Sequence, residues 1–333
     1  MHPIDIAVPC YNYGRYLTEC VDSILGQEGC SVRILIIDDA SSDGSVEVAR
    51  GLAARDPRIE VIAHAENKGH VATFNEGVAW AQQKYFLLIS ADDVLAPSAL
   101  KRAADLLEAN PDVVFVHGYA ICFRGEVPPS TKDLGPDPPR IVTGPQFIAS
   151  ICANPINPVV TATAVVRTSA QKKVGLYKHE LPHAGDFEMW LRCAMCGDVG
   201  EIDSVQGFRR MHDSNLSTLY VADGLMFDFT QRYDTFRIFF AEHGHDLKDA
   251  KHLRTMANHR LADQIINEAS VQFRKRHVLA TLELLQLAFR IAPSMVLTSQ
   301  WWSRVATWSW RRARRVPAGI KRRLSALAKR AIH

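Results

Sequence analysis

The first 125 residues alternate short apolar runs with longer segments in which apolar residues recur every three or four positions. Short apolar runs bounded by turn residues are typical of buried strands, whereas the three-to-four spacing is typical of helices with one buried face. The predicted strands are residues 4–8, 32–37, 60–64, 85–90 and 113–121. The predicted helices are residues 15–27, 70–82 and 97–110. This order predicts an α/β fold with a doubly wound, mainly parallel sheet.

The pattern changes after residue 125. Residues 125–145 are rich in proline and glycine, which predicts a loop leading out of the first half. A predicted strand at 161–167 and a predicted helix at 186–195 follow, and residues 222 to about 290 have a helical pattern with charged faces. We therefore expect three parts, which are an α/β domain at 1–218, a helical extension at 219–298 and a tail at 299–333.

Two of the predicted strands end in adjacent carboxylates. Asp38 and Asp39 follow the second strand, and Asp92 and Asp93 follow the fourth. Aspartate is favoured in turns and at helix starts, so either pair alone could be structural. In open α/β sheets, however, ligands lie beyond the carboxyl ends of the strands, where two such pairs would repel each other without a cation or donors. Because Mg²⁺ and Mn²⁺ prefer oxygen ligands, the pattern favours a metal–diphosphate site.

Two other classes of nucleotide-binding protein fit the first turn poorly. A dinucleotide-binding domain needs a G-x-G-x-x-G turn after its first strand. The turn here reads PCYNYGRYL and has a single glycine, which excludes that class. A nucleotidyltransferase would need a basic, glycine-rich loop to hold a triphosphate, and this turn supplies only Arg15.

Four segments carry a family resemblance. They read VPCYNYGRYLTECVDSILGQ, IIDDASSDGS, NKGHVATFNEG and LLISADDVLAP. In order and spacing they resemble the successive signatures of glycosyltransferase family 2, the inverting nucleotide-sugar transferases with the GT-A fold. The similarity covers residues 4 to about 100, and weaker matches at AGDFEMWLR and RRMHDSNLS extend it to about residue 218. It implies a GT-A catalytic domain at 1–218, a nucleotide-sugar donor, a divalent metal (Mn²⁺ or Mg²⁺) and inversion at the anomeric carbon.

The resemblance also implies which residues bind the nucleotide. Asp39 falls where the family hydrogen-bonds the base, with Asp38 beside it. An aspartate suits the N–H of a pyrimidine, which favours a UDP- or dTDP-sugar. The other residues carried over to the nucleotide site are Pro9, Tyr11, Asn12, Asn67 and Gly69.

The resemblance assigns the metal site to Asp92 and Asp93, which fall in the D-x-D region of the family. Ser90 stands where many members have the first aspartate, so which of the two carboxylates binds the metal directly stays open. Arg210 and His212 match an R-x-H motif that approaches the diphosphate or the metal. An isolated histidine is also common as a structural residue.

Asp186 is the expected catalytic base. Inverting transfer needs a carboxylate that takes the proton of the acceptor hydroxyl as its oxygen attacks the sugar. Asp186 matches the aspartate of the family's E-D pair, while Gly185 replaces the glutamate, so Glu188 is a second candidate. An aspartate that caps the following helix is the structural alternative, and it is compatible with catalysis.

Two further motifs resemble metal sites. Residues 179–183 spell H-E-x-x-H, a zinc motif that requires a helix, but Pro182 disfavours a helix there. Cys193 and Cys196 form a C-x-x-C pair without a second ligand pair, and buried thiols are the better interpretation.

The charge of the chain is divided unevenly. The chain has 39 Lys/Arg and 36 Asp/Glu, but residues 301–333 hold ten Lys/Arg and no Asp/Glu, which leaves a net −7 on the rest. Two apolar stripes run through this tail, formed by Trp301, Trp302, Val305 and Trp308 and by Ile320, Leu324, Leu327 and Ala331. A basic amphipathic tail favours docking on an anionic membrane surface. Packing on the acidic body and nucleic-acid binding are the alternatives, and nucleic acid fits a sugar transferase poorly.

These observations lead to one expected function and one alternative. We expect metal-assisted, inverting transfer of a sugar to a hydroxyl of a glycan or lipid-linked acceptor. The alternative is a non-catalytic nucleotide-sugar-binding or assembly subunit of the same fold, which Ser90 and Gly185 favour. The chain lacks a secretory signal pattern and an apolar run of membrane-spanning length, and its seven cysteines are scattered. We therefore expect a cytoplasmic protein, associated with the inner face of the membrane through its tail.

Overall fold

The computed structural model describes residues 1–128, 138–213, 215 and 224–294. The chain divides into two compact units, residues 1–150 with 156–222 and residues 151–155 with 223–333. The expected boundary at residue 218 and the basic tail lie outside the described residues. The three-part division therefore stays a prediction.

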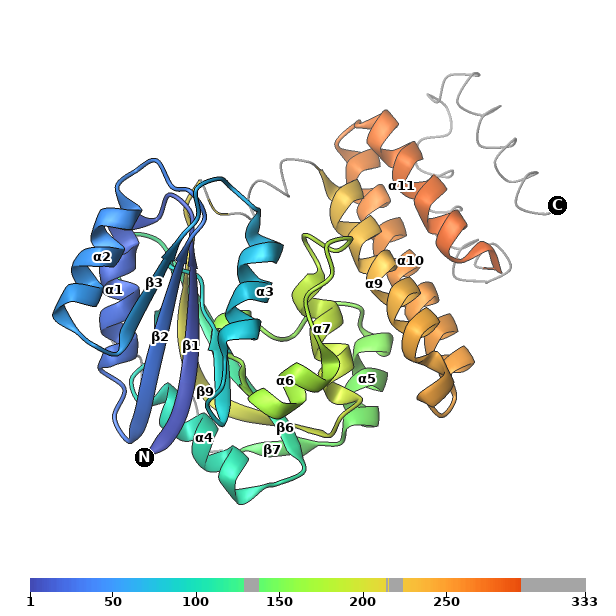
Figure 1. The fold of residues 1–333 in the computed structure, drawn as a ribbon. Coiled ribbons are helices and arrows are strands. Elements are labelled where there is room, and N and C mark those ends of the chain that lie inside the picture. Colours follow the sequence, from blue (N-terminus) through green and yellow to red (C-terminus); the bar gives the residue numbers. More distant parts are fainter. Residues whose placement is uncertain (129–137, 214, 216–223, 295–333) are drawn as a thin grey trace. The chain divides into compact units, whose positions relative to one another are not determined.

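The first unit is built on a nine-stranded sheet in the order β3-β2-β1-β4-β8-β6-β9-β5, with β7 also paired to β9 (Figure 1). The strands β1 to β4 run parallel, β6 and β9 share their direction, and β5, β7 and β8 run the opposite way. The strands are β1 His2–Cys10, β2 Cys30–Asp38, β3 Ile59–Ala63, β4 Tyr85–Leu88, β5 Val94–Leu95, β6 Val113–Phe123, β7 Arg140–Val142, β8 Val165–Arg167 and β9 Asp198–Arg210. This mostly parallel sheet confirms the predicted fold class.

Helices α1 to α3 cover the parallel half of the sheet, and further helices pack around its second half (Figure 1). They are α1 Gly14–Leu25, α2 Ser45–Arg55, α3 His70–Trp80, α4 Ala99–Ala109, α5 Gly144–Ala153, α6 Thr168–Val174 and α7 Gly185–Ala194, with a 3₁₀ turn η1 at Thr161–Thr163. Alternate residues of β1 (Ile4, Ile6 and Val8) pack with α1, α2 and α4 in one core. Figure 1 shows α3 on the opposite side of the sheet from α1 and α2. There α3 approaches β1 so closely that a Cβ on Gly77 would lie 2.6 Å from the Cβ of Ala7.

The sheet departs from the predicted strands in its second half. The predicted strand at 161–167 is divided into η1 and the short β8. β8 is inserted antiparallel between β4 and β6, so the fifth predicted strand does not pair directly with the fourth. β9, with 13 residues, has charged residues at irregular positions and two glycines, and its sequence predicts no strand.

The second unit contains the helices α9 Leu225–His243, α10 Ala250–Arg274 and α11 Val278–Ile291, with a 3₁₀ turn η2 at Gly244–Asp246. Phe229, Leu261, Ile265, Leu284 and Ile291 belong to one apolar core that these helices share. The helical pattern predicted for residues 222 to about 290 is therefore present. Among the described helices, none has both the length and the apolar content needed to cross a bilayer.

A buried histidine lies in the core of the first unit. His117 on β6 is 8% exposed and lies against the rings of Phe115 and Phe147. Its Nε2 atom has no hydrogen-bond partner among the described residues. Burial lowers the pKa of His117 from 6.5 to about 4, because a protonated ring here would lack solvent.

His117 should make the stability of the protein depend on pH. Because the folded state binds the proton less readily than the unfolded chain, stability is lost as the pH falls from 6.5 toward 4. Relative to His117→Leu, the wild-type free energy of unfolding should fall by about 2 kcal/mol between pH 7.5 and pH 5. Urea unfolding of both proteins at the two pH values measures this difference. An equal loss in both proteins would contradict the assignment.

Candidate active site

The first strand joins both acid pairs at one edge of the sheet. The backbone N–H of Asp39 donates to the carbonyl of Cys10 over 2.9 Å, and the N–H of Ala91 donates to the carbonyl of Pro9 over 3.1 Å. The end of β2 and the segment after β4 are therefore held on either side of the buried Pro9 and Cys10. The carboxyl ends of these strands form the edge at which open α/β sheets bind ligands.

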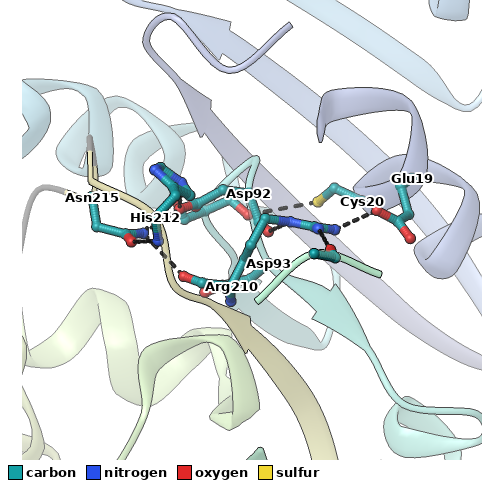
Figure 2. A network of polar contacts seen from close by, with 9 residues as sticks. Glu19, Cys20, Asp92, Asp93, Arg210, His212 and Asn215 are labelled. Carbon is teal, nitrogen blue, oxygen red and sulfur yellow. Dashed lines mark hydrogen bonds and ion pairs between the residues drawn. The ribbon is translucent and has the colours of Figure 1, made fainter. Parts of the chain in front are cut away.

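Asp92 and Asp93 lie in a polar network with the end of β9 (Figure 2). The Asp92 carboxylate accepts hydrogen bonds from His212 Nε2 at 3.1 Å and from Asn215 Nδ2 at 2.9 Å. The backbone N–H of Arg210 donates to Asp93 Oδ1 over 3.1 Å. Residues that are more than a hundred positions apart in the sequence are thus brought together around the second acid pair.

The side chain of Arg210 connects three parts of this network. It is 5% exposed, and its guanidinium donates to the Asp92 carbonyl at 3.1 Å, to the Gly125 carbonyl at 2.6 Å and to the Glu19 carboxylate. The guanidinium also lies over the ring of Tyr16, with 4.7 Å to the ring centroid. These contacts tie α1, the segment after β4 and the segment after β6 to the end of β9, so Arg210 fixes the shape of the site.

His212 is held among aromatic rings. Its imidazole stacks on Tyr16 with 5.0 Å between centroids and meets the edge of Tyr13 at 5.4 Å. Its Nε2 atom therefore stays directed at Asp92, and the backbone N–H of His212 donates to the amide oxygen of Asn215.

The second acid pair fits a divalent cation. Burial, followed by the charge of Asp92, raises the pKa of Asp93 well above its ordinary value. A buried pair of carboxylates is costly without a compensating positive charge. Two carboxylates with the imidazole of His212 within 3.1 Å of one of them form a donor set that suits Mn²⁺ or Mg²⁺.

The first acid pair forms a separate network at the end of β2. The carboxylate of Asp39 accepts from His64 Nδ1 at 2.8 Å, from the N–H of Lys68 at 2.8 Å and from the N–H of Gly69 at 2.9 Å. Asn67 Nδ2 donates to the Asp39 carbonyl, and the Gly69 N–H also approaches Asn67 Oδ1. Gly69 has a φ of 83°, a conformation that favours glycine, so the N-x-G segment can wrap the carboxylate closely.

The loop after β1 is bound to the loop after β2. Asn12 Oδ1 accepts from the N–H of Ser42, and the Asn12 N–H donates to Ser41 Oγ, each over 2.8 Å. The N–H of Ser41 donates in turn to Asp38 Oδ1 over 2.9 Å. Asp38 Oδ2 is buried and has no partner among the described residues, while the ring of Tyr11 is 49% exposed. An exposed aromatic ring therefore lies in the loop after β1, while an acceptor without a partner among the described residues lies buried at the end of β2.

Asp186 lies in the first turn of α7, where the sequence analysis expects it. It is partly buried and accepts hydrogen bonds from Asn157 Nδ2 at 3.0 Å and Thr161 Oγ1 at 3.3 Å. Burial raises the pKa of the Asp186 carboxyl above its ordinary value. A carboxylate that is oriented by two side chains and made more basic by burial is suited to accept a proton.

Glu188 does not share this arrangement. Its fully buried carboxylate is paired with Arg192, with 2.9 Å from Arg192 Nε to each oxygen. The same guanidinium donates to the carbonyls of Val174 and Leu176. Glu188 and Arg192 therefore stabilise the connection between α6 and α7, and the role of Glu188 is structural.

The two remaining motifs belong to the scaffold. Residues 179–183 lie between α6 and α7 outside any helix, so the two histidines of H-E-x-x-H do not share a helix face. Cys193 is buried on α7, Cys196 is partly buried just after it, and both are free thiols.

Sequence reasoning missed several residues of the site. Asn215 follows His212 by three positions within the RRMHDSNLS segment, so a signal for it existed. Glu19, His64 and Asn157 contact site residues 25 or more positions away, and no local pattern marks such contacts.

The mostly parallel sheet with carboxylates on both sides of the end of β1 defines a GT-A α/β protein, the fold class of the nucleotide-sugar transferases. Residues 5–167 match the model of glycosyl transferase family 2. These residues form a glycosyltransferase family 2 domain. The protein is therefore an enzyme of the transferase class. The resemblance of the sequence to this family is therefore confirmed.

Comparison with individual proteins supports the same class. A relative from Haemophilus influenzae named as an uncharacterized glycosyltransferase is 24% identical over 65% of this chain and 68% of its own length. The matched segments cover less than half the length of three other curated relatives. The structure of S. aureus TarS 1–349 in complex with UDP-GlcNAc is similar in fold, with a TM-score of 0.66 and 18% identity over 89% of this chain and 83% of TarS. The mannosyltransferase PcManGT from Pyrobaculum calidifontis, in complex with GDP-Man and Mn²⁺, has a TM-score of 0.52 and 17% identity over 99% of this chain and 84% of that protein.

Proposed function

We propose that the chain transfers a sugar, with inversion, from a nucleoside-diphosphate sugar to a hydroxyl of a glycan or lipid-linked acceptor. The observation that carries this proposal is the pair of acidic networks flanking the end of β1 within a family 2 domain. Similar folds in complex with UDP-GlcNAc and GDP-Man support a nucleotide-sugar donor. A thermal-shift screen of UDP, dTDP and GDP with Mn²⁺ tests the donor, because bound ligand stabilises the folded state.

The donor would lie along the carboxyl edge of the sheet. Asp39 would accept a hydrogen bond from the base, since three donors occupy its carboxylate and a carboxylate offers about four acceptor positions. The exposed ring of Tyr11 lies in the loop after β1, and the buried Oδ2 of Asp38, without a partner among the described residues, lies at the end of β2. An aspartate suits the N3–H of uracil or thymine, which supports a UDP- or dTDP-sugar, and the screen includes GDP because guanine also presents an N–H.

Asp92, Asp93 and His212 would hold a divalent metal, with Arg210 fixing their positions. When bound, Mn²⁺ or Mg²⁺ would neutralise the negative charge of the leaving diphosphate. Asp186 would take the proton of the acceptor hydroxyl. The hydroxyl oxygen would then bond to the anomeric carbon as the bond between that carbon and the diphosphate oxygen breaks. Asn157 and Thr161 hold the carboxylate in one orientation for this transfer.

Asp92→Ala and Asp93→Ala should each remove metal-dependent nucleotide binding. At a UDP concentration about a hundred times the Kd, bound UDP should stabilise the wild type by about 2.7 kcal/mol when Mn²⁺ is present. Either variant should lose this stabilisation, because the cation loses a ligand. Asp105→Asn, at an exposed acid on α4, is the matched control. Full activity of the wild type in EDTA would show that the metal assignment is wrong.

Asp186→Asn should lose turnover by about 10²- to 10⁴-fold, because it removes the proton acceptor. Its Kd for the donor should stay close to that of the wild type. Glu188→Gln should instead lower the thermal stability, because it removes the charge that compensates the buried Arg192. Release of free nucleoside diphosphate, together with donor titration, separates the two effects. An active Asp186→Asn and a folded but inactive Glu188→Gln would reverse the assignment.

The non-catalytic alternative rests on Ser90 and Gly185, which replace family carboxylates. Under this alternative the chain would bind a nucleotide sugar without releasing the nucleoside diphosphate. The same release assay distinguishes it from the enzyme.

We also infer that the tail at 299–333 docks the protein on an anionic membrane, where a lipid-linked acceptor would be met. The tail lies outside the described residues, so this inference rests on its apolar stripes and ten Lys/Arg. Each cation near an anionic leaflet contributes about 1 kcal/mol. The full chain should sediment with anionic vesicles, and a chain ending at residue 299 should stay in the supernatant. Equal binding of both, or binding of neither, would contradict the proposal.

A further inference from the structure

His64 occupies a position between two carboxylates. It lies just after β3, its side chain is 2% exposed, and its ring nitrogens lie 2.8 Å from Asp39 Oδ1 and 2.7 Å from Glu76 Oε2. The backbone N–H of His64 also donates to the Asp38 carbonyl over 2.9 Å. Each ring nitrogen thus lies within hydrogen-bond distance of a carboxylate oxygen, and carboxylates only accept hydrogen bonds. The resemblance to family signatures assigns no role to His64 or Glu76.

Glu76 connects this histidine to the helix beyond it. Glu76 lies on α3, is 33% exposed and lies 3.9 Å from Lys68 Nζ. A chain of contacts thus runs from α3 through the imidazole to the end of β2. Because His64 is anchored at its backbone and at both ring nitrogens, it holds the Asp39 carboxylate in one orientation.

The geometry points to His64 as a positioning residue for base recognition, acting through Asp39. The inference rests on the proposed function, in which Asp39 accepts a hydrogen bond from the N3–H of a pyrimidine. Two backbone N–H groups from the N-x-G segment and one imidazole N–H leave about one acceptor position of Asp39 open. The imidazole donor fixes which position that is, and so selects a ligand that presents an N–H there.

Two conservative substitutions separate the two ring contacts. In His64→Asn, the amide nitrogen replaces Nδ1 and keeps a donor for Asp39, but it does not reach Glu76. In His64→Gln, the amide nitrogen lies near the former Nε2 and keeps a donor for Glu76, but none for Asp39. A histidine that serves only to fill the core would respond to both substitutions through stability alone, without separating them in nucleotide affinity.

The test measures the Kd of UDP in the presence of Mn²⁺ by calorimetry, for the wild type, His64→Asn and His64→Gln. His64→Gln should bind UDP about tenfold more weakly, a loss of about 1.4 kcal/mol, and His64→Asn should recover most of that affinity. Turnover at saturating donor should change little in either variant, because the reacting atoms are not touched. His2→Gln, at the start of β1, is the matched histidine control.

A modified ligand makes the readout specific to the base. N3-methyl-UDP lacks the N–H, so the wild type should bind it more weakly than UDP, and this discrimination should shrink in His64→Gln. Equal Kd values for UDP in both His64 variants, with unchanged discrimination, would overturn the inference. A wild type that binds no UDP would instead contradict the proposed donor. Thermal unfolding of each variant shows whether it is folded under the assay conditions.

Discussion

Four carboxylates at one edge of the sheet are the constraint on which the rest of the site depends. Asp38, Asp39, Asp92 and Asp93 are all less than 9% exposed, and their charges repel one another in a medium of low polarity. The groups that compensate the negative charge differ between the two pairs. Backbone N–H groups and His64 surround Asp39, whereas His212, Asn215 and the N–H of Arg210 meet the second pair.

This difference divides the edge into two kinds of site. The donors around Asp39 are largely backbone groups of a short, glycine-containing turn, so they offer a fixed shape that suits recognition of a flat base. At the second pair, side chains meet Asp92 and a backbone N–H meets Asp93, and burial still raises the pKa of Asp93. A cation can replace such side-chain partners, whereas the backbone around Asp39 cannot be displaced without unfolding the turn. Under the proposed function, recognition of the base and binding of the cation would therefore lie on opposite sides of β1.

The sequence predicts the parallel half of the fold well because each of its elements is locally consistent. Strand β2 and helix α1, for example, lie within a few residues of the predicted boundaries, since their apolar residues follow one period. β9 was missed because its burial pattern is irregular, its pairing with β6 shifts register, and it buries one charged residue, Arg210. Its end supplies Arg210 to the site, so the part of the site that depends on β9 was recognised only as a motif.

Asn215 and Glu19 show why the site is less predictable than the fold. Asn215 donates to Asp92, 123 positions away, and Glu19 pairs with Arg210, 191 positions away. Such contacts exist only after β9 has paired with β6 and has brought Arg210 over Tyr16 and Phe123. The second acid pair can be predicted from the sequence because it directly follows a predicted strand. The groups that compensate its charge come from the end of β9, the last strand in the sequence, and from the residues just after it. Because the end of β9 and the residues just after it supply the partners of Asp92 and Asp93, the second acid pair depends on a strand that closes the sheet far from it in the sequence.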